Sequence, residues 1–99
     1  MNLQNASIGY INESELVDIR EVDIEVLDIG DYVIGVQHSE FHEFDQEFQP
    51  GGSPSDLIYW GADFVMRKSD QSFEFHDYWT TASDADRAAL KKAVIGLMK

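Results

Sequence analysis

Residues 21–38 read EVDIEVLDIGDYVIGVQH, and this stretch decides the fold. From Val22 to Val26, β-branched residues alternate with acidic residues, which is the period-2 pattern of a half-buried strand. Residues 28–31 have the composition of a turn, and residues 32–38 form a second apolar run. The stretch therefore predicts a core strand over about 22–26 and an antiparallel buried strand over 32–38.

The alternation changes phase twice, at Arg20–Glu21 and at Val26–Leu27. A shift of one residue moves every following side chain to the other face of a sheet. We therefore expect a bulge or a tight turn at each change of phase.

Further strands are indicated on both sides of this hairpin. Residues 8–11 suit a short strand, and the aromatic, apolar run 57–67 predicts a long strand bent at Gly61. Residues 68–71 then form a hairpin turn, and residues 72–79 the returning strand.

The C-terminal segment has the pattern of an amphipathic helix. Ser83 and Asp86 approximate a capping box at its start. One face carries Leu90, Ala93, Val94, Leu97 and Met98. The sequence thus predicts a single α+β domain over residues 1–99, with a small antiparallel sheet of about four to five strands and a C-terminal helix packed on it.

The composition excludes several classes of protein. A hydrophobic fraction of 43% argues against disorder, and the absence of cysteine excludes disulfides and thiolate metal sites. No apolar run approaches the length of a membrane span, so we expect a cytoplasmic protein. A net charge of −12 disfavours direct binding to nucleic acid or to anionic membranes.

This charge is concentrated in one half of the chain. Residues 1–50 hold 12 acidic residues and one arginine, a net −11, whereas residues 51–99 hold 7 acidic and 6 basic residues, a net −1. Such asymmetry is typical of an acidic tail or an interaction surface, and the interleaving of these acids with apolar residues favours the interaction surface.

Two acidic groups are the candidate partner-binding residues. On a strand, alternate residues are about 6.6 Å apart, so the first group would form a row of carboxylates. The second group interleaves carboxylates with phenylalanines, whose spacing suits either a helical face or an irregular segment. The alternative to partner binding is that the acids are solvated and the phenylalanines belong to the core. The candidates are Glu21, Asp23 and Glu25, then Glu40, Phe41, Glu43, Phe44, Asp45 and Glu47.

No pattern of catalytic or cofactor-binding residues stands out. His38 and His42 are four residues apart, with Glu43 adjacent, but lack a His-Glu-x-x-His motif, so surface histidines are favoured over a metal site. Ser53 and Ser55 lack the context of a nucleophile elbow. We expect no enzyme, no cofactor and no metal.

Residues 31–79, about half the chain, resemble small toxin-immunity families of α+β architecture. The resemblance rests on residues 31–36, a polar loop, residues 61–67, and a hairpin into residues 73–75. It implies a protein that neutralises a toxin by binding it.

The sequence therefore predicts an acidic inhibitor that binds and neutralises a basic, nucleic-acid-processing partner protein of the toxin type. Evenly spaced anions also suit a nucleic-acid mimic, so the alternative is a phage anti-CRISPR or anti-restriction inhibitor. A small enzyme or a structural subunit is a further alternative. The oligomeric state stays open.

Overall fold

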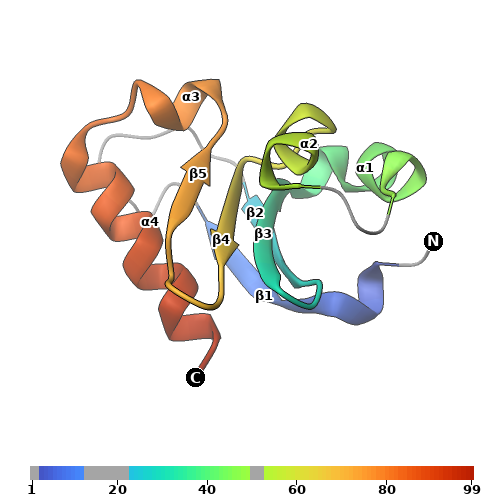
Figure 1. Cartoon of the computed structure of the whole chain (residues 1–99), viewed down its shortest axis with the longest axis horizontal. Helices are drawn as coiled ribbons and strands as arrows, with labels where there is room; N and C mark the ends of the chain where they lie inside the picture. Colours follow the sequence, from blue (N-terminus) through green and yellow to red (C-terminus); the bar gives the residue numbers. More distant parts are fainter. Residues whose placement is uncertain (1–2, 13–22, 50–52) are drawn as a thin grey trace.

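The computed structural model of this chain describes residues 3–12, 23–49 and 53–99, except for the side chains of residues 77 and 78. Groups of consecutive strands are separated by short helices, and the chain ends in the longer helix α4 (Figure 1). The elements are η1 (Gln4–Ala6), β1 (Ser7–Asn12), β2 (Asp23–Asp28), β3 (Tyr32–Gln37), η3 (His38–Glu40), α1 (Phe41–Glu47), α2 (Pro54–Tyr59), β4 (Phe64–Arg67), β5 (Phe73–Phe75), α3 (Asp77–Thr80) and α4 (Asp84–Leu97).

The described strands form one antiparallel sheet in the order β1-β2-β3-β4-β5. The expected hairpin is present, since β2 pairs with β3 from Ile24 opposite Gln37 to Asp28 opposite Val33. In its turn, Gly30 has a φ of +99°, a conformation that L side chains rarely adopt, and donates a hydrogen bond to Asp28. The α+β class with a small antiparallel sheet and a C-terminal helix is confirmed.

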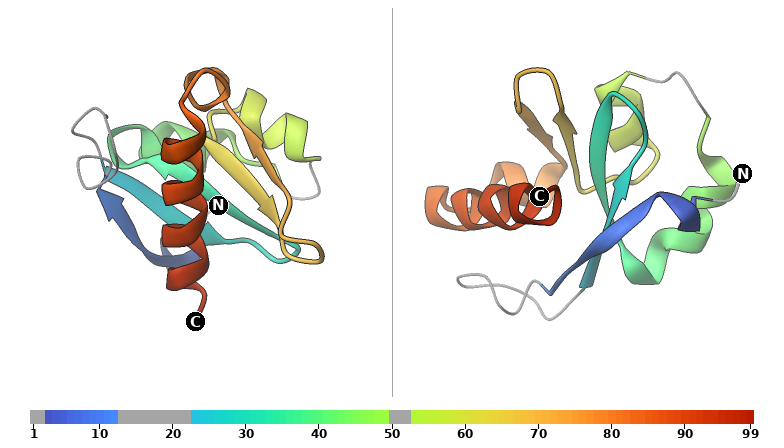
Figure 2. Two further views of the ribbon diagram at one scale, coloured as in Figure 1. Left: turned by 90° about the vertical axis from the view of Figure 1, so that its left-hand side faces the viewer. Right: turned by 90° about the horizontal axis from the view of Figure 1, so that it is seen from below.

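Helices cover both faces of the sheet, which gives three layers (Figure 2). On one side α4 and Trp79 pack against strand residues that include Ile24, Val26 and Met66. On the other side α1 and α2 pack against the alternate strand residues, among them Leu27 and Ile34. The central strands are therefore buried on both faces.

This double burial explains the change of phase at Val26–Leu27. Val26 and Leu27 are both buried, and they belong to the cores on opposite faces of the sheet. Consecutive apolar residues therefore need no bulge in β2, which stays in regular register with β3. The irregularity lies on the neighbouring strand instead: the β1–β2 register shifts between Ser7 and Gly9, opposite Val26 and Leu27. The bulge thus occurs in β1 and not in β2. The change of phase at Arg20–Glu21 lies outside the described residues.

The prediction of one long strand over residues 57–67 was wrong. Residues 54–59 form α2, and only residues 64–67 form β4. The Ser53 hydroxyl accepts a hydrogen bond from the Asp56 amide, the Asp56 carboxylate accepts one from the Ser53 amide, and proline occupies the first turn. This capping box and Pro54 start a helix despite the β-favouring side chains that follow.

The returning strand over residues 72–79 is shorter than expected. β5 ends at Phe75, because the His76 amide bonds to Asp63 while the His76 carbonyl already accepts from the amides of Trp79 and Thr80. The chain thereby enters α3. Ser83 caps α4 as expected, and Leu90 and Val94 of this helix are buried, whereas Met98, just after its last residue, is exposed.

Candidate functional site

Helix α1 separates the two residue types that the sequence interleaves. Phe41 and Phe44 lie in the core between α1 and the sheet, 8% and 2% exposed, whereas Glu40, Glu43 and Glu47 are exposed. The phenylalanine spacing thus forms one helical face, as one of the two readings expected. The expectation that these rings anchor a partner is corrected, because they already anchor α1 to the sheet.

Asp45 has a structural contact. Its carboxylate accepts a hydrogen bond from the Leu3 backbone amide at 2.8 Å, and Leu3 is buried in the same core. Asp45 therefore ties the N-terminal segment to α1.

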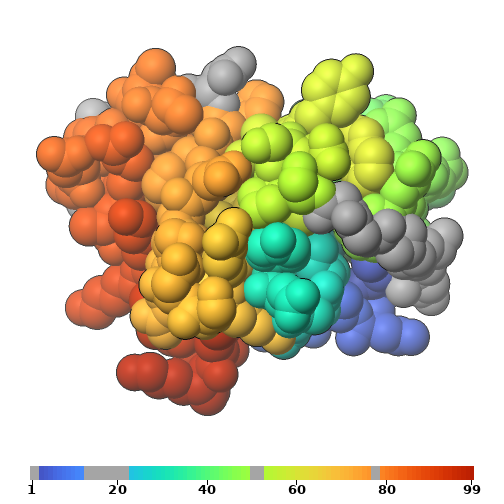
Figure 3. Space-filling model, in the orientation of Figure 1, coloured from blue at the N-terminus to red at the C-terminus, as the bar shows by residue number. Residues whose placement is uncertain are grey.

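Helix α2 adds an exposed aromatic side chain to the same layer. α1 and α2 lie on the same side of the sheet and share a core through Phe44 and Leu57. On the outside, Asp56 is exposed and Tyr59 is 86% exposed. In the space-filling view α2, in yellow-green, stands at the surface (Figure 3). We call Glu40, Glu43, Glu47, Asp56 and Tyr59 the acidic face.

The row of carboxylates expected along β2 does not form an exposed surface. Glu21 lies outside the described residues, Asp23 is exposed, and Glu25 is buried with 4% exposure. Glu25 and Leu27 are two residues apart on β2, so they lie on the same face of the sheet, the one that α1 and α2 cover. The prediction that Glu25 is exposed is therefore wrong.

Glu25 is surrounded by two aromatic side chains. Tyr10 in β1 is its cross-strand partner, and the Nδ1 atom of His38 lies 3.6 Å from Glu25 Oε2. The negative charge of Glu25, then a hydrogen bond to its carboxylate, then burial and the charge of Asp23 raise the pKa of Tyr10. The Tyr10 and His38 rings meet edge to face, with centroids 5.6 Å apart. We call Tyr10, Glu25 and His38 the Glu25 cluster.

The two histidines singled out by the sequence do not converge. His38 faces Glu25, whereas His42 shares a hydrogen bond of 3.0 Å with the Gln46 amide nitrogen. Within the described residues, no group of three or more histidine, aspartate and glutamate side chains is placed to hold a metal ion.

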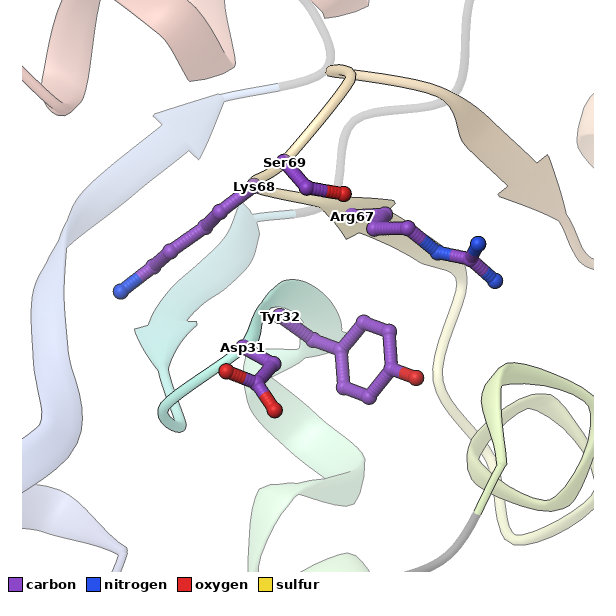
Figure 4. Close-up of a pocket in the computed structure, with 5 residues that line it drawn as sticks. All are labelled: Asp31, Tyr32, Arg67, Lys68 and Ser69. Carbon is purple, nitrogen blue, oxygen red and sulfur yellow. The ribbon is translucent and has the colours of Figure 1, made fainter.

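A shallow depression of about 540 Å³ lies between the β2–β3 and β4–β5 turns (Figure 4). Its lining includes Tyr32, Arg67 and Ser69, and the Lys68 amide joins the two turns by bonding to Asp31. The Lys68 ammonium contacts Asp28 at 2.6 Å, and the hydrogen bond from Lys68 is the main cause of the lowered pKa of Asp28. The lining carries charges of both signs, so it defines no ligand chemistry.

No known protein family, no curated protein and no solved structure matches this chain significantly. No helix in the described part of the chain is both long and apolar enough to cross a membrane. The fold and the site define a small acidic α+β protein with an exposed aromatic residue in its negatively charged helical layer.

Proposed function

We propose that the protein is an inhibitor that binds a basic, nucleic-acid-processing protein through the acidic face. One observation carries the proposal: Glu43 and Glu47 of α1, and Glu40 just before it in η3, are exposed while the phenylalanines of α1 hold it on the sheet. Carboxylates fixed on a packed helix present their charge in a defined arrangement. They therefore favour charge complementarity with a particular partner over general solubility.

Tyr59 supplies the second element that protein interfaces need. Aromatic side chains are enriched among the residues that dominate binding energy, and charged neighbours steer association. Tyr59 is 86% exposed and lies in the same helical layer as the carboxylates. It takes the anchoring role that the sequence had assigned to Phe41 and Phe44.

The test compares two charge-reversed variants with equal net charge. In the first, Glu43→Lys and Glu47→Lys change the acidic face. In the second, Asp31→Lys and Glu74→Lys change exposed carboxylates outside it. Asp45 is left unchanged because its reversal would break the contact with the Leu3 amide.

A basic partner is captured from host lysate with the wild-type protein, identified and purified, and its binding kinetics are measured at low and high salt. We expect the acidic-face variant to associate about tenfold or more slowly at low salt, with near wild-type association for the control variant. Tyr59→Ala is expected to speed dissociation about tenfold or more. Equal affinities of the two charge-reversed variants, or binding that does not depend on salt, would contradict the proposal.

A further inference from the structure

The Glu25 carboxylate is an incompletely paired charge inside the protein. Its side chain is 5% exposed, and its Oε2 atom is buried with no hydrogen-bond partner in the described part of the chain. Buried polar atoms in native proteins are nearly always hydrogen-bonded, and buried acids are nearly always paired. Such an atom calls for a cationic or hydrogen-bond-donating group.

Among the described residues, the groups that face Glu25 leave Oε2 without a hydrogen bond. Tyr10 on β1 hydrogen-bonds to the carboxylate, and Val36, the cross-strand partner of Glu25 on β3, is apolar. From η3, His38 Nδ1 lies at 3.6 Å, beyond hydrogen-bonding distance. In the described residues the lysine and arginine ion pairs go to Asp28 and Asp84 instead.

The two rings of the cluster are open to solvent although the carboxylate beside them is not. Tyr10 is 56% exposed and the His38 side chain 60% exposed. His38 is also the first residue of η3, which leads directly into α1 and the acidic face. The exposed His38 ring lies beside the buried Oε2 atom, so an external group would reach this atom by displacing that ring.

We infer that the Glu25 cluster receives an arginine side chain of the basic partner; this inference rests on the proposed function. A guanidinium group is planar, donates parallel hydrogen bonds to a carboxylate and stacks on aromatic rings. Glu25 supplies the acceptor oxygen, and Tyr10 and His38 supply the exposed rings. A lysine ammonium group is a compact, strongly hydrated charge that lacks this planar complementarity.

The inference is tested without the partner. N-acetyl-arginine methylamide is titrated into the full chain, and the aromatic signals of Tyr10 and His38 are followed by NMR. The matched probe is the citrulline analogue, which replaces the guanidinium by an uncharged urea. Glu25→Gln removes the acceptor charge, and Glu74→Gln removes one exposed charge elsewhere.

We expect both ring signals to shift with the arginine probe, and affinity to fall about tenfold or more in Glu25→Gln but less than about twofold in Glu74→Gln. Tyr10→Leu keeps the carboxylate and is expected to weaken binding about threefold through loss of the ring. It also tests the inference if Glu25→Gln does not fold. Unchanged signals would overturn the inference, as would equal affinity for the citrulline analogue or for a third probe, N-acetyl-lysine methylamide. Equal effects of the two glutamine variants, or a response to Zn²⁺ alone, would also overturn it.

The outcomes separate this inference from the proposed function. If a purified partner binds Glu25→Gln as tightly as wild type but loses affinity for the acidic-face variant, the inhibitor proposal holds and the arginine site is wrong. If the arginine probe binds at Glu25 while no basic partner depends on the acidic face, the site holds and the inhibitor proposal is wrong.

Discussion

Gly35 on the central strand β3 has no room for a side chain. It pairs with Phe64 of β4 and with Val26 of β2. A Cβ atom at Gly35 would lie 2.6 Å from Phe64 Cδ1 and 2.8 Å from Ile24 Cγ2, well inside ordinary van der Waals contact. Phe64 and Ile24 are both fully buried, so neither can move toward solvent. We therefore expect Gly35→Ala to be strongly destabilising.

Overpacking a core costs about 1–3 kcal/mol, and Phe64 is further confined by the Phe73 ring, 5.8 Å away between centroids. Alanine restricts the unfolded chain more than glycine does, and this offsets about 0.5 kcal/mol of the destabilisation. We expect a net loss of about 2 kcal/mol in the free energy of unfolding. At about 4–8 °C per kcal/mol, the melting temperature should fall by roughly 8–16 °C.

The free energy is measured by urea unfolding at equilibrium, followed by tryptophan fluorescence. Gly96→Ala is the matched control, because a Cβ atom at this position in α4 has no atom within 4 Å, and the variant should be about 0.5–1 kcal/mol more stable. Phe64→Leu relieves the clash in the Gly35→Ala background. Its cost in free energy of unfolding should therefore be smaller there than in the wild-type background, by about 1 kcal/mol or more. A loss below about 0.5 kcal/mol for Gly35→Ala, or additive costs in the double variant, would refute this reasoning.

Two further changes test individual contacts. Ser53→Ala removes the side chain that caps α2 and should lower the free energy of unfolding by about 1 kcal/mol in the same assay, whereas Ser55→Ala in the first turn should change it little; equal effects would contradict the assigned cap. Lys68→Met removes the partner of Asp28, both partly exposed, so it should cost only about 0.5 kcal/mol near pH 6. Because the folded-state pKa of Asp28 is lowered, this contribution is present above the unfolded pKa of about 3.9 and is lost as the pH falls through the lower folded value. A difference in stability between wild type and variant that persists at about pH 2 would contradict the ion pair.

The local patterns that predicted structure correctly are those that depend on neighbouring residues. The run 22–38 specified its own hairpin, because turn chemistry at Gly30 and apolar strands on each side act within a few residues. Ser83 and the apolar spacing of Leu90 and Val94 specified α4 in the same way. The segment 54–59 also carried a local signal, the Ser53–Asp56 capping box with Pro54, which the aromatic residues after it obscured.

The candidate site depended more on long-range contacts. The sequence identified the exposed carboxylates of η3 and α1 but not Tyr59. Tyr59 is one of twelve aromatic residues, and no local pattern marks it as exposed. It also placed Glu25 in a row of accessible anions. Only the packing of η3 and α1 over that face of the sheet turns Glu25 into a buried group beside Tyr10 and His38.

By itself, the sequence determined the α+β class, the central hairpin, the C-terminal helix and the location of the excess negative charge. These follow from side-chain periodicity, turn chemistry and composition, which act along the chain. The tertiary structure alone decided which side chains water reaches. Burial depends on the helices that cover each face of the sheet, so Phe41 and Glu25 became interior while Tyr59 stayed outside.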